Sequence, residues 1–466
     1  MAQIAPFIGA IFMGIENPVL NQLINSQKTR LEGSLWSNES DREKYRFELS
    51  PNVKLFNREQ ENELREISSA VYAPGGFLHG SLKMFSALKE SDALKGSLTG
   101  GMIWKSLSLG INKYELGVQA LFNQLPLFAR CDLMLQSDQS AGQIYFQIAE
   151  IEGDKSHGMG YYDGFILLNS KEIIGQIPGT TFVEAIKGAV GDETIFLLVG
   201  DSERFYLAEM EKLLQPAARQ AGLKLTVATE ESLKINPGQN YPLEVGRSKS
   251  RWLVNIPTLN PNGHLVKPAG AGGENIYDLY KDGAVYCLIP PNRFLCNKSL
   301  LGVISNGLND PMIDQWLQEY FKWSTIQTLR KYLPTTILVT KANKNEVAGL
   351  LQKEGDKWVI KKTVSSGAKG VSLTNNGNDG RGTMIADLMT APASYILQLK
   401  VEQTPLPFWH TESGHLNHSL MYTRVELYSQ YGDGGILTVG ITARKSKAVH
   451  VQKDAIQIPV RFAPTQ

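Results

Sequence analysis

Two glutamates at the end of an apolar stretch are the first residues here whose chemistry needs an explanation. The segment 148–153 is IAEIEG, so Glu150 and Glu152 are two positions apart. Residues two apart on a β-strand point to the same face, so both carboxylates would point the same way. Such a pair is repulsive unless a positive charge lies close to it. The pattern therefore predicts a site that holds a cation.

The composition narrows the classes of protein to consider. The 466 residues suffice for two or three domains. Lys plus Arg number 47 and Asp plus Glu number 46, so no net field favours nucleic acid or an anionic membrane, and we expect neither as a partner. Three cysteines, none in a CxxC pair, favour a reducing compartment. The apolar start lacks a basic residue before it, so we expect a cytoplasmic protein without a signal peptide.

Hydrophobic periodicity predicts the elements that must position these residues. In 57–72 apolar residues recur at helical spacing, which predicts a helix in a mostly helical first 125 residues. Residues 127–152 are expected to form a β-hairpin. A strand, a helix and a second strand are predicted over 194–229. No glycine motif of a nucleotide-binding fold occurs there, which favours a substrate-side α/β domain over a nucleotide-binding one.

A second group of chemically interesting residues lies in 357–373. A strand ending near Lys361 is followed by a loop and by another strand from Val371. Backbone N–H groups of a glycine loop can surround a polyphosphate, although a solvated basic turn is the alternative. Two later strands, over 422–447, carry Arg424 near their start and Arg444 near their end. The loop consists of Ser365, Ser366, Gly367, Ala368, Lys369 and Gly370.

The order of these motifs resembles that of circularly permuted ATP-grasp ligases, the arrangement of glutathionylspermidine synthase and eukaryotic glutathione synthetase. The resemblance covers about residues 125–460 and rests on six short motifs in the family's order. They are 130-RCD-132, 150-EIEGD-154, 292-NRFLCNKSLL-301, 358-WVIKK-362, 398-QLKV-401 and 444-RKS-446.

The chain departs from the family in two places. Glu152 stands where the family usually has asparagine, which adds one negative charge to the site. The loop sequence Ser-Ser-Gly-Ala-Lys-Gly replaces the Arg-Glu-Gly of glutathionylspermidine synthase. These departures affect the expected metal geometry and the expected substrate class.

The resemblance implies an α/β (α+β mixed) protein with a permuted ATP-grasp fold and an inserted Rossmann-like α/β substrate domain. It implies ATP and Mg²⁺ as cofactors, with Mg²⁺ as the cation that the carboxylates hold. Mg²⁺ prefers carboxylate and phosphate oxygens. The implied regions are 1–125, a helical N-terminal region; 126–190, the part with the metal-binding strands; 191–290, the α/β substrate-side domain; and 291–466, the part with the lysines, glycine loop, adenine hinge and last arginine.

The resemblance also implies a role for each site residue. Asp132, Glu150 and Glu152 would be the metal ligands. Arg130 and Arg444 would be catalytic and contact the transferred phosphoryl group. Lys298, Lys361 and the glycine loop would bind phosphates. The adenine would lie against Gln398, Leu399, Lys400 and Val401.

The implied reaction joins a small-molecule carboxylate to an amine through an acyl phosphate. Such a reaction needs positioning and charge neutralisation more than a protein nucleophile. Two alternatives stay open: a non-catalytic nucleotide-binding protein, and a phosphotransferase that forms no amide bond. The sequence does not identify the two substrates, and it leaves a homodimer open.

The shared metal site places a condition on the hairpin. If Asp132 lies opposite Glu150, the sum of paired residue numbers is even, which requires a turn with an odd number of residues or a bulge. Segment 137–143 could supply such a turn. Two weaker candidates are a polar loop with His410, His415 and His418, and a glycine-rich loop in which His157, Tyr161 and Tyr162 would contact substrate.

Overall fold

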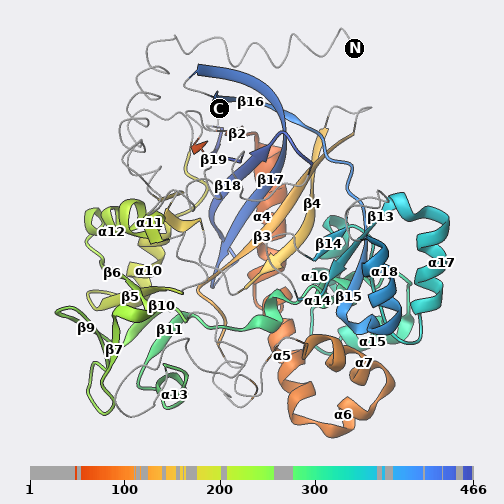
Figure 1. Ribbon diagram of the computed structural model, residues 1–466, viewed down its shortest axis with the longest axis horizontal. Coiled ribbons are helices and arrows are strands. Elements are labelled where there is room, and N and C mark those ends of the chain that lie inside the picture. Colours follow the sequence, from red (N-terminus) through yellow and green to blue (C-terminus); the bar gives the residue numbers. More distant parts are fainter. Residues whose placement is uncertain are drawn as a thin grey trace.

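The protein has a mixed α/β architecture, seen in a computed structural model (Figure 1). One large sheet stands at its centre, with a parallel α/β unit on one side and a smaller antiparallel sheet on the other. The structure describes residues 48–49, 54–109, 111, 116, 124–138, 143–153, 158–160, 162–163, 176–200, 207–256, 276–364, 370–372, 381–412, 415–432, 434–447 and 455–463.

The central sheet combines strands from the early and late parts of the chain. In the described residues it has eight strands, in the order β1-β19-β18-β17-β3-β4, with β16 paired to β17 and β2 to β19. The antiparallel pairing of β17 with β3 joins segments that are far apart in the sequence. The strands are β1 Glu48–Leu49, β2 Lys54–Phe56, β3 Phe128–Asp138, β4 Gln143–Glu152, β16 Leu406–Glu412, β17 His415–Gln430, β18 Ile436–Arg444 and β19 Ile456–Phe462.

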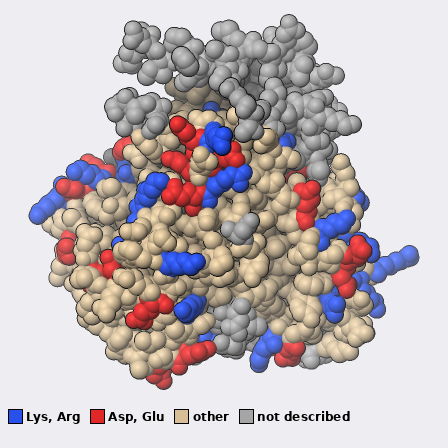
Figure 2. All heavy atoms as spheres, turned by 180° about the vertical axis from the view of Figure 1, so that it is seen from behind, with Lys and Arg blue, Asp and Glu red and all other residues tan. Residues whose placement is uncertain are grey.

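The two faces of this sheet differ in chemistry. One face is apolar, with Cys131, Leu427 and Ile441 fully buried, and helix α4 (Arg58–Tyr72) packs on it. The helix predicted from 57–72 is confirmed, and it begins with a capping box made by Asn57 and Gln60. The outer face of α4 is charged, and acidic and basic side chains are interspersed on the side of the molecule seen in Figure 2. The opposite face of the sheet carries the candidate site.

The predicted hairpin is confirmed, and its register meets the stated condition through a bulge. Asp132 lies opposite Glu150, whereas Leu133 lies opposite Ile148, so Ala149 is an extra residue in β4. The bulge lets Ile148 enter the apolar core while Glu150 points to the polar face, which a regular strand would not allow. The proposed turn within 137–143 lies mostly outside the described residues.

The predicted strand–helix–strand unit belongs to a parallel sheet, in the order β11-β10-β5-β6. Its middle helix contains a π-helical turn, and Gly222, with a φ of 71°, ends it as expected from the sequence. A small meander extends the unit. The elements are α10 Phe182–Val190, β5 Thr194–Val199, α11 Leu207–Glu209, η3 Met210–Leu214, α12 Gln215–Gln220, β6 Lys224–Thr229, η4 Glu230–Ser232, β7 Leu233–Ile235, β8 Leu243–Val245, β9 Ser248–Ser250, β10 Trp252–Asn255, α13 Ile276–Lys281 and β11 Tyr286–Ile289.

The smaller sheet is antiparallel, in the order β12-β15-β13-β14. Two helices, α17 and α18, share a hydrophobic cluster with it, and α14 also contacts it. The strand expected to end near Lys361 and the strand expected from Val371 are both confirmed. The elements are α14 Ser299–Ser305, β12 Thr336–Leu338, α17 Lys344–Glu354, η6 Gly355–Lys357, β13 Trp358–Lys362, β14 Val371–Ser372, α18 Arg381–Thr390, η7 Pro392–Ser394 and β15 Tyr395–Leu399.

The remaining helices lie below and beside these sheets (Figure 1). Within the described residues, no helix combines the length and the apolar character needed to cross a membrane. One expectation was wrong: most of the histidine-containing segment 409–419 belongs to the hairpin β16–β17 and is not a loop. The helices are α5 Phe77–Glu90, α6 Asp92–Gly96, α7 Leu98–Leu107, η5 Arg293–Cys296, α15 Pro311–Leu317 and α16 Trp323–Tyr332.

Candidate functional site

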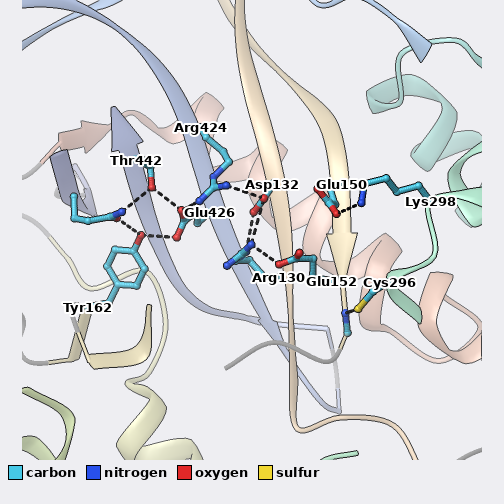
Figure 3. Close-up of polar contacts among 12 residues, drawn as sticks. Arg130, Asp132, Glu150, Glu152, Tyr162, Cys296, Lys298, Arg424, Glu426 and Thr442 are labelled. Carbon is cyan, nitrogen blue, oxygen red and sulfur yellow. Dashed lines mark hydrogen bonds and ion pairs between the residues drawn. The ribbon is translucent and has the colours of Figure 1, made fainter. Parts of the chain in front are cut away.

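A row of charged side chains crosses the polar face of the central sheet (Figure 3). On β3, Arg130 donates from Nε to Asp132 Oδ1 at 2.8 Å and from Nη2 to Asp132 Oδ2 at 3.3 Å. The same Nη2 also donates to Glu152 on β4. Only 4–8% of each of these three residues is exposed. The predicted sharing of one face by Arg130 and Asp132 is confirmed.

The row continues onto β17 with two residues that the sequence did not identify as site residues. Arg424 pairs with Asp132, with 3.4 Å between Nη1 and Oδ2, and it donates to Glu426. Glu426 also accepts from Thr442 Oγ1 at 2.6 Å and from the Tyr162 hydroxyl at 2.8 Å. An available signal was the Arg-x-Glu pattern at 424–426, which repeats on an apolar strand the Arg-x-Asp spacing of β3.

These five charged groups do not balance. Three carboxylates, Asp132, Glu152 and Glu426, face the two guanidinium groups of Arg130 and Arg424. Burial raises the pKa of Asp132 to about 6, although both arginines oppose that shift. Burial also tends to raise the pKa of Glu426, but the charge of Arg424 outweighs it and the pKa falls to about 2. Of these two carboxyls, Asp132 therefore takes up a proton at the higher pH.

Two lysines contact strand β4 of the same hairpin. Lys298, directly before α14, pairs with Glu150 at 2.6 Å between Nζ and Oε1. Lys361, on β13, donates to the Ala149 carbonyl at 3.2 Å and to Gln398 Oε1 at 2.6 Å. Only 4% of Lys298 and 9% of Lys361 is exposed. Burial lowers the pKa of Lys361 to about 8, whereas for Lys298 burial is outweighed by Glu150 and the pKa rises.

The carboxylates suit magnesium in type and in register, but all three already contact basic side chains. Asp132 and Glu150 lie directly opposite each other, and Glu152 follows on the same face. Asp132 and Glu152 accept from Arg130, and Glu150 accepts from Lys298. Among the described residues, no group of three or more His, Cys, Asp and Glu is arranged to hold a metal ion. A metal would therefore require these ion pairs to exchange partners, so the magnesium site stays a prediction.

The glycine loop predicted to bind phosphate lies mostly outside the described residues. Ser365, Ser366, Gly367, Ala368 and Lys369 are not described, whereas the Gly370 carbonyl accepts from the Lys362 N–H at 2.7 Å and closes the β13–β14 connection.

In the segment expected to meet adenine, two backbone N–H groups already have partners. Leu399 donates to the Thr335 carbonyl and Lys400 to the Lys357 carbonyl, each at 2.7 Å. Val401 follows in the connection to β16. The Gln398 side chain contacts Lys361 and Thr336.

Five further residues complete the comparison with the sequence. Arg444 ends β18, two positions after Thr442 and thus on the polar face, and is 8% exposed. Tyr162 is 2% exposed and its hydroxyl donates to Glu426, so its expected contact with substrate stays a prediction. His157 and Tyr161 are not described. Cys131 is fully buried, and burial raises the pKa of its thiol.

The comparison with known proteins rests on structure. No family model matches the sequence, and no curated protein matches it. A solved structure, that of a glutathione synthetase-like effector from Globodera pallida in its apo form, is similar with a TM-score of 0.57 and 12% identity. The similarity covers 96% of this chain and 98% of that chain. The chain therefore shares the fold of this glutathione synthetase-like protein.

Two more distant structures were also found. One is a provisionally named gamma-glutamylcysteine synthetase from Methylobacillus flagellatus, with a TM-score of 0.34, 13% identity and coverage of 77% of this chain and 86% of that chain. The other is a D-alanyl-alanine synthetase from Vibrio cholerae, with a TM-score of 0.25, 12% identity and coverage of 52% and 68%. At these TM-scores the two carry no argument, so the glutathione synthetase-like fold rests on the first structure.

Proposed function

We propose that this protein is an ATP-dependent carboxylate–amine ligase with a circularly permuted ATP-grasp arrangement, which forms an amide bond through an acyl phosphate. The observation that carries the proposal is the convergence of two buried lysines on one carboxylate. Lys298 and Lys361 come from different elements, and both act electrostatically on Glu150. Buried cations of this kind suit the phosphates of a nucleotide, whose charge they would neutralise.

Each group of residues in the proposed site would contact a different part of the bound ligands. Lys298 and Lys361 would bind nucleotide phosphates, and Arg130 and Arg444 would contact the transferred phosphoryl group. The segment Gln398–Val401 would contact adenine. Magnesium, when bound through Asp132, Glu150 and Glu152, would neutralise phosphate charge. The parallel α/β unit would contribute the pocket for the carboxylate and amine substrates.

Nucleotide binding is expected to change the ion pairs Lys298–Glu150 and Arg130–Glu152. Phosphate oxygens bound at Lys298 and Arg130 would compete with Glu150 and Glu152 for these basic groups. Phosphate oxygens would replace the carboxylates as partners of the basic groups, and the freed carboxylates would become available to the metal. Nucleotide and magnesium are therefore expected to bind more tightly together than either does alone.

The first experiment measures thermal stabilisation by Mg·ATP and then the release of ADP. A ligand present at 100 times its Kd stabilises a protein by about 2.7 kcal/mol. A ligase is expected to release ADP only when both a carboxylate and an amine are supplied. ADP release that needs a carboxylate but no amine would instead show a phosphotransferase.

A second candidate function is nucleotide binding without catalysis. It is favoured by the pairing of all three proposed metal ligands with basic side chains. This candidate gains thermal stability from Mg·ATP but releases no ADP with any combination of carboxylate and amine. The same experiment therefore separates the two functions.

Three substitutions test the assigned residues. Lys361→Met should abolish ATP turnover while the circular-dichroism spectrum and the thermal midpoint show a folded protein. Glu152→Gln should reduce turnover less than Glu150→Gln, because the glutamine keeps an oxygen ligand where the resembled family has a neutral amide. Normal turnover in the lysine variant would remove its phosphate role, and a greater loss in Glu152→Gln would contradict the equivalence to asparagine.

A further inference from the structure

A continuous chain of hydrogen bonds runs from the smaller sheet to the bulge of the hairpin. Thr336 Oγ1, on β12, donates to the Pro334 carbonyl at 2.7 Å. Gln398 Nε2, on β15, donates to Thr336 Oγ1 at 3.0 Å, and Gln398 Oε1 accepts from Lys361 Nζ at 2.6 Å. Lys361 Nζ also donates to the carbonyl of Ala149, the extra residue of β4, at 3.2 Å.

The donors and acceptors of this chain fix its direction. A threonine hydroxyl has one proton, and the Thr336 proton is used by the Pro334 carbonyl. Thr336 can therefore only accept from Gln398, so the NH₂ group of the glutamine must face it. The amide oxygen is then left for Lys361, and no reversed orientation of the amide satisfies all three residues. Gln398 is 3% exposed and Thr336 is fully buried, so water does not loosen the arrangement.

The bulge supplies the second acceptor. Ala149 has no paired residue on β3, and its carbonyl is the hairpin's contact with Lys361. An ammonium group has three protons. The two contacts, to Ala149 and Gln398, leave one proton of Lys361 for a further acceptor.

The two lysines of the site are held by acceptors of different charge. Lys298 is held by the carboxylate of Glu150, which neutralises it in the absence of a ligand. Lys361 is held by a carbonyl and an amide oxygen, which fix its position, and no carboxylate of the described residues contacts it directly. An anion therefore meets a positioned, charged group at Lys361 without first breaking an ion pair there.

We propose that Gln398 and Thr336 are positioning residues that hold Lys361 for the phosphates of a nucleotide, with the Ala149 carbonyl as the second anchor. The inference rests on the proposed function, since it assumes a phosphate-bearing ligand. It assigns the side chain of Gln398 to the lysine in place of the adenine contact proposed above, and it leaves adenine to Leu399, Lys400 and Val401. The neutrality of Gln398 is part of the assignment, because a carboxylate at this position would hold the lysine equally well but cancel its charge.

The test compares binding of Mg·ADP with binding of adenosine, which lacks phosphates. Gln398→Met should raise the Kd of Mg·ADP about tenfold and Thr336→Val about threefold, by calorimetry, while adenosine binding by saturation-transfer NMR stays unchanged. A tenfold change in Kd corresponds to about 1.4 kcal/mol. In a Lys361→Met background, neither substitution should weaken Mg·ADP binding further.

Two further variants separate position from charge and from general damage. Gln398→Glu keeps the acceptor oxygen but adds a negative charge, so it should weaken Mg·ADP binding at least as much as Gln398→Met. A purely structural role would instead let Gln398→Glu retain wild-type binding. Thr335→Val is the matched control, because Thr335 is the exposed neighbour of Thr336 and only its backbone carbonyl contacts β15. Circular dichroism of each variant establishes that it is folded.

The outcomes distinguish this inference from the proposed function. If Lys361→Met loses Mg·ADP affinity while Gln398→Met and Thr336→Val bind like wild type, the positioning assignment is overturned and the nucleotide function stands. If adenosine binding falls in parallel with Mg·ADP binding, the effect is not on the lysine and the assignment is also overturned. If the wild-type protein binds neither Mg·ATP nor Mg·ADP, the proposed function fails and the inference fails with it.

Discussion

Replacing Glu152 with glutamine tests whether the cluster on β3, β4 and β17 carries one excess negative charge. The substitution removes one of three buried carboxylates and keeps an amide oxygen that can accept from Arg130. Arg130 also keeps its two hydrogen bonds to Asp132, so no guanidinium is left without a partner. The main electrostatic change is the loss of a like charge beside Asp132, and the pKa of Asp132 should fall.

The expected magnitude follows from the pKa of Asp132. Burial raises this pKa from 3.8 to about 6, and Glu152 adds to the rise. Each unit corresponds to about 1.4 kcal/mol, so the whole shift is worth about 3 kcal/mol. Because the folded-state pKa is the higher one, this stabilisation is complete below pH 3.8 and is lost as the pH rises to about 6. Because Glu152 contributes only part of the rise, the variant should lose less stability than wild type between pH 5 and pH 7, by up to about 1 kcal/mol.

Urea unfolding at pH 5, 6 and 7, followed by tryptophan fluorescence, measures this difference. Asp163 also has a pKa that burial raises, to about 7, but it is present in both proteins and its effect cancels in the comparison. Glu211→Gln is the control, because Glu211 is an exposed glutamate outside the cluster. An unchanged or steeper loss of stability in Glu152→Gln would refute the excess charge.

Three other substitutions test the packing and hydrogen bonds around the site. Gly440→Ala should destabilise the fold by about 3 kcal/mol and lower the thermal midpoint, since its Cβ would lie 2.0 Å from ring carbons of Tyr162; a midpoint like that of wild type would show that the ring is free to move. Tyr162→Phe removes a hydrogen bond to the Glu426 carboxylate and should cost about 1.5–3 kcal/mol in urea unfolding, a cost that is absent if the hydroxyl is solvated. Asp163→Asn should reduce the fall in stability between pH 5 and pH 7, because the carboxyl with its raised pKa is gone; an unchanged pH profile would contradict that pKa.

The parts of the fold that depend on local sequence could be predicted. The helix over 57–72, the hairpin over 127–152 and the strand around Lys361 each have a periodicity that local residues determine. The bulge also has a local signal, because the buried residues Phe146 and Ile148 are followed by Ile151, which changes the phase of the alternation. The sequence predicted only that a bulge or an odd turn was needed, and the structure selected the bulge.

The parts that depend on long-range pairing could not be predicted. Arg424 and Glu426 join the site because β17 pairs with β3, and no periodicity within either strand indicates which strand will be its neighbour. The same limit applies to the basic partners of the carboxylates. Each glutamate was expected to face a metal, but in the structure the nearby cations are Arg130 and Lys298, which three-dimensional packing supplies.

The pairing of β3 with β17 has a consequence for biosynthesis. The two strands are separated by roughly 280 residues, which a ribosome needs roughly 15–60 s to synthesise. During that interval the hairpin β3–β4 has an exposed edge, and its charged face has no partner from β17. A truncation before residue 415 is therefore expected to leave the β3 edge unpaired and the hairpin prone to aggregation.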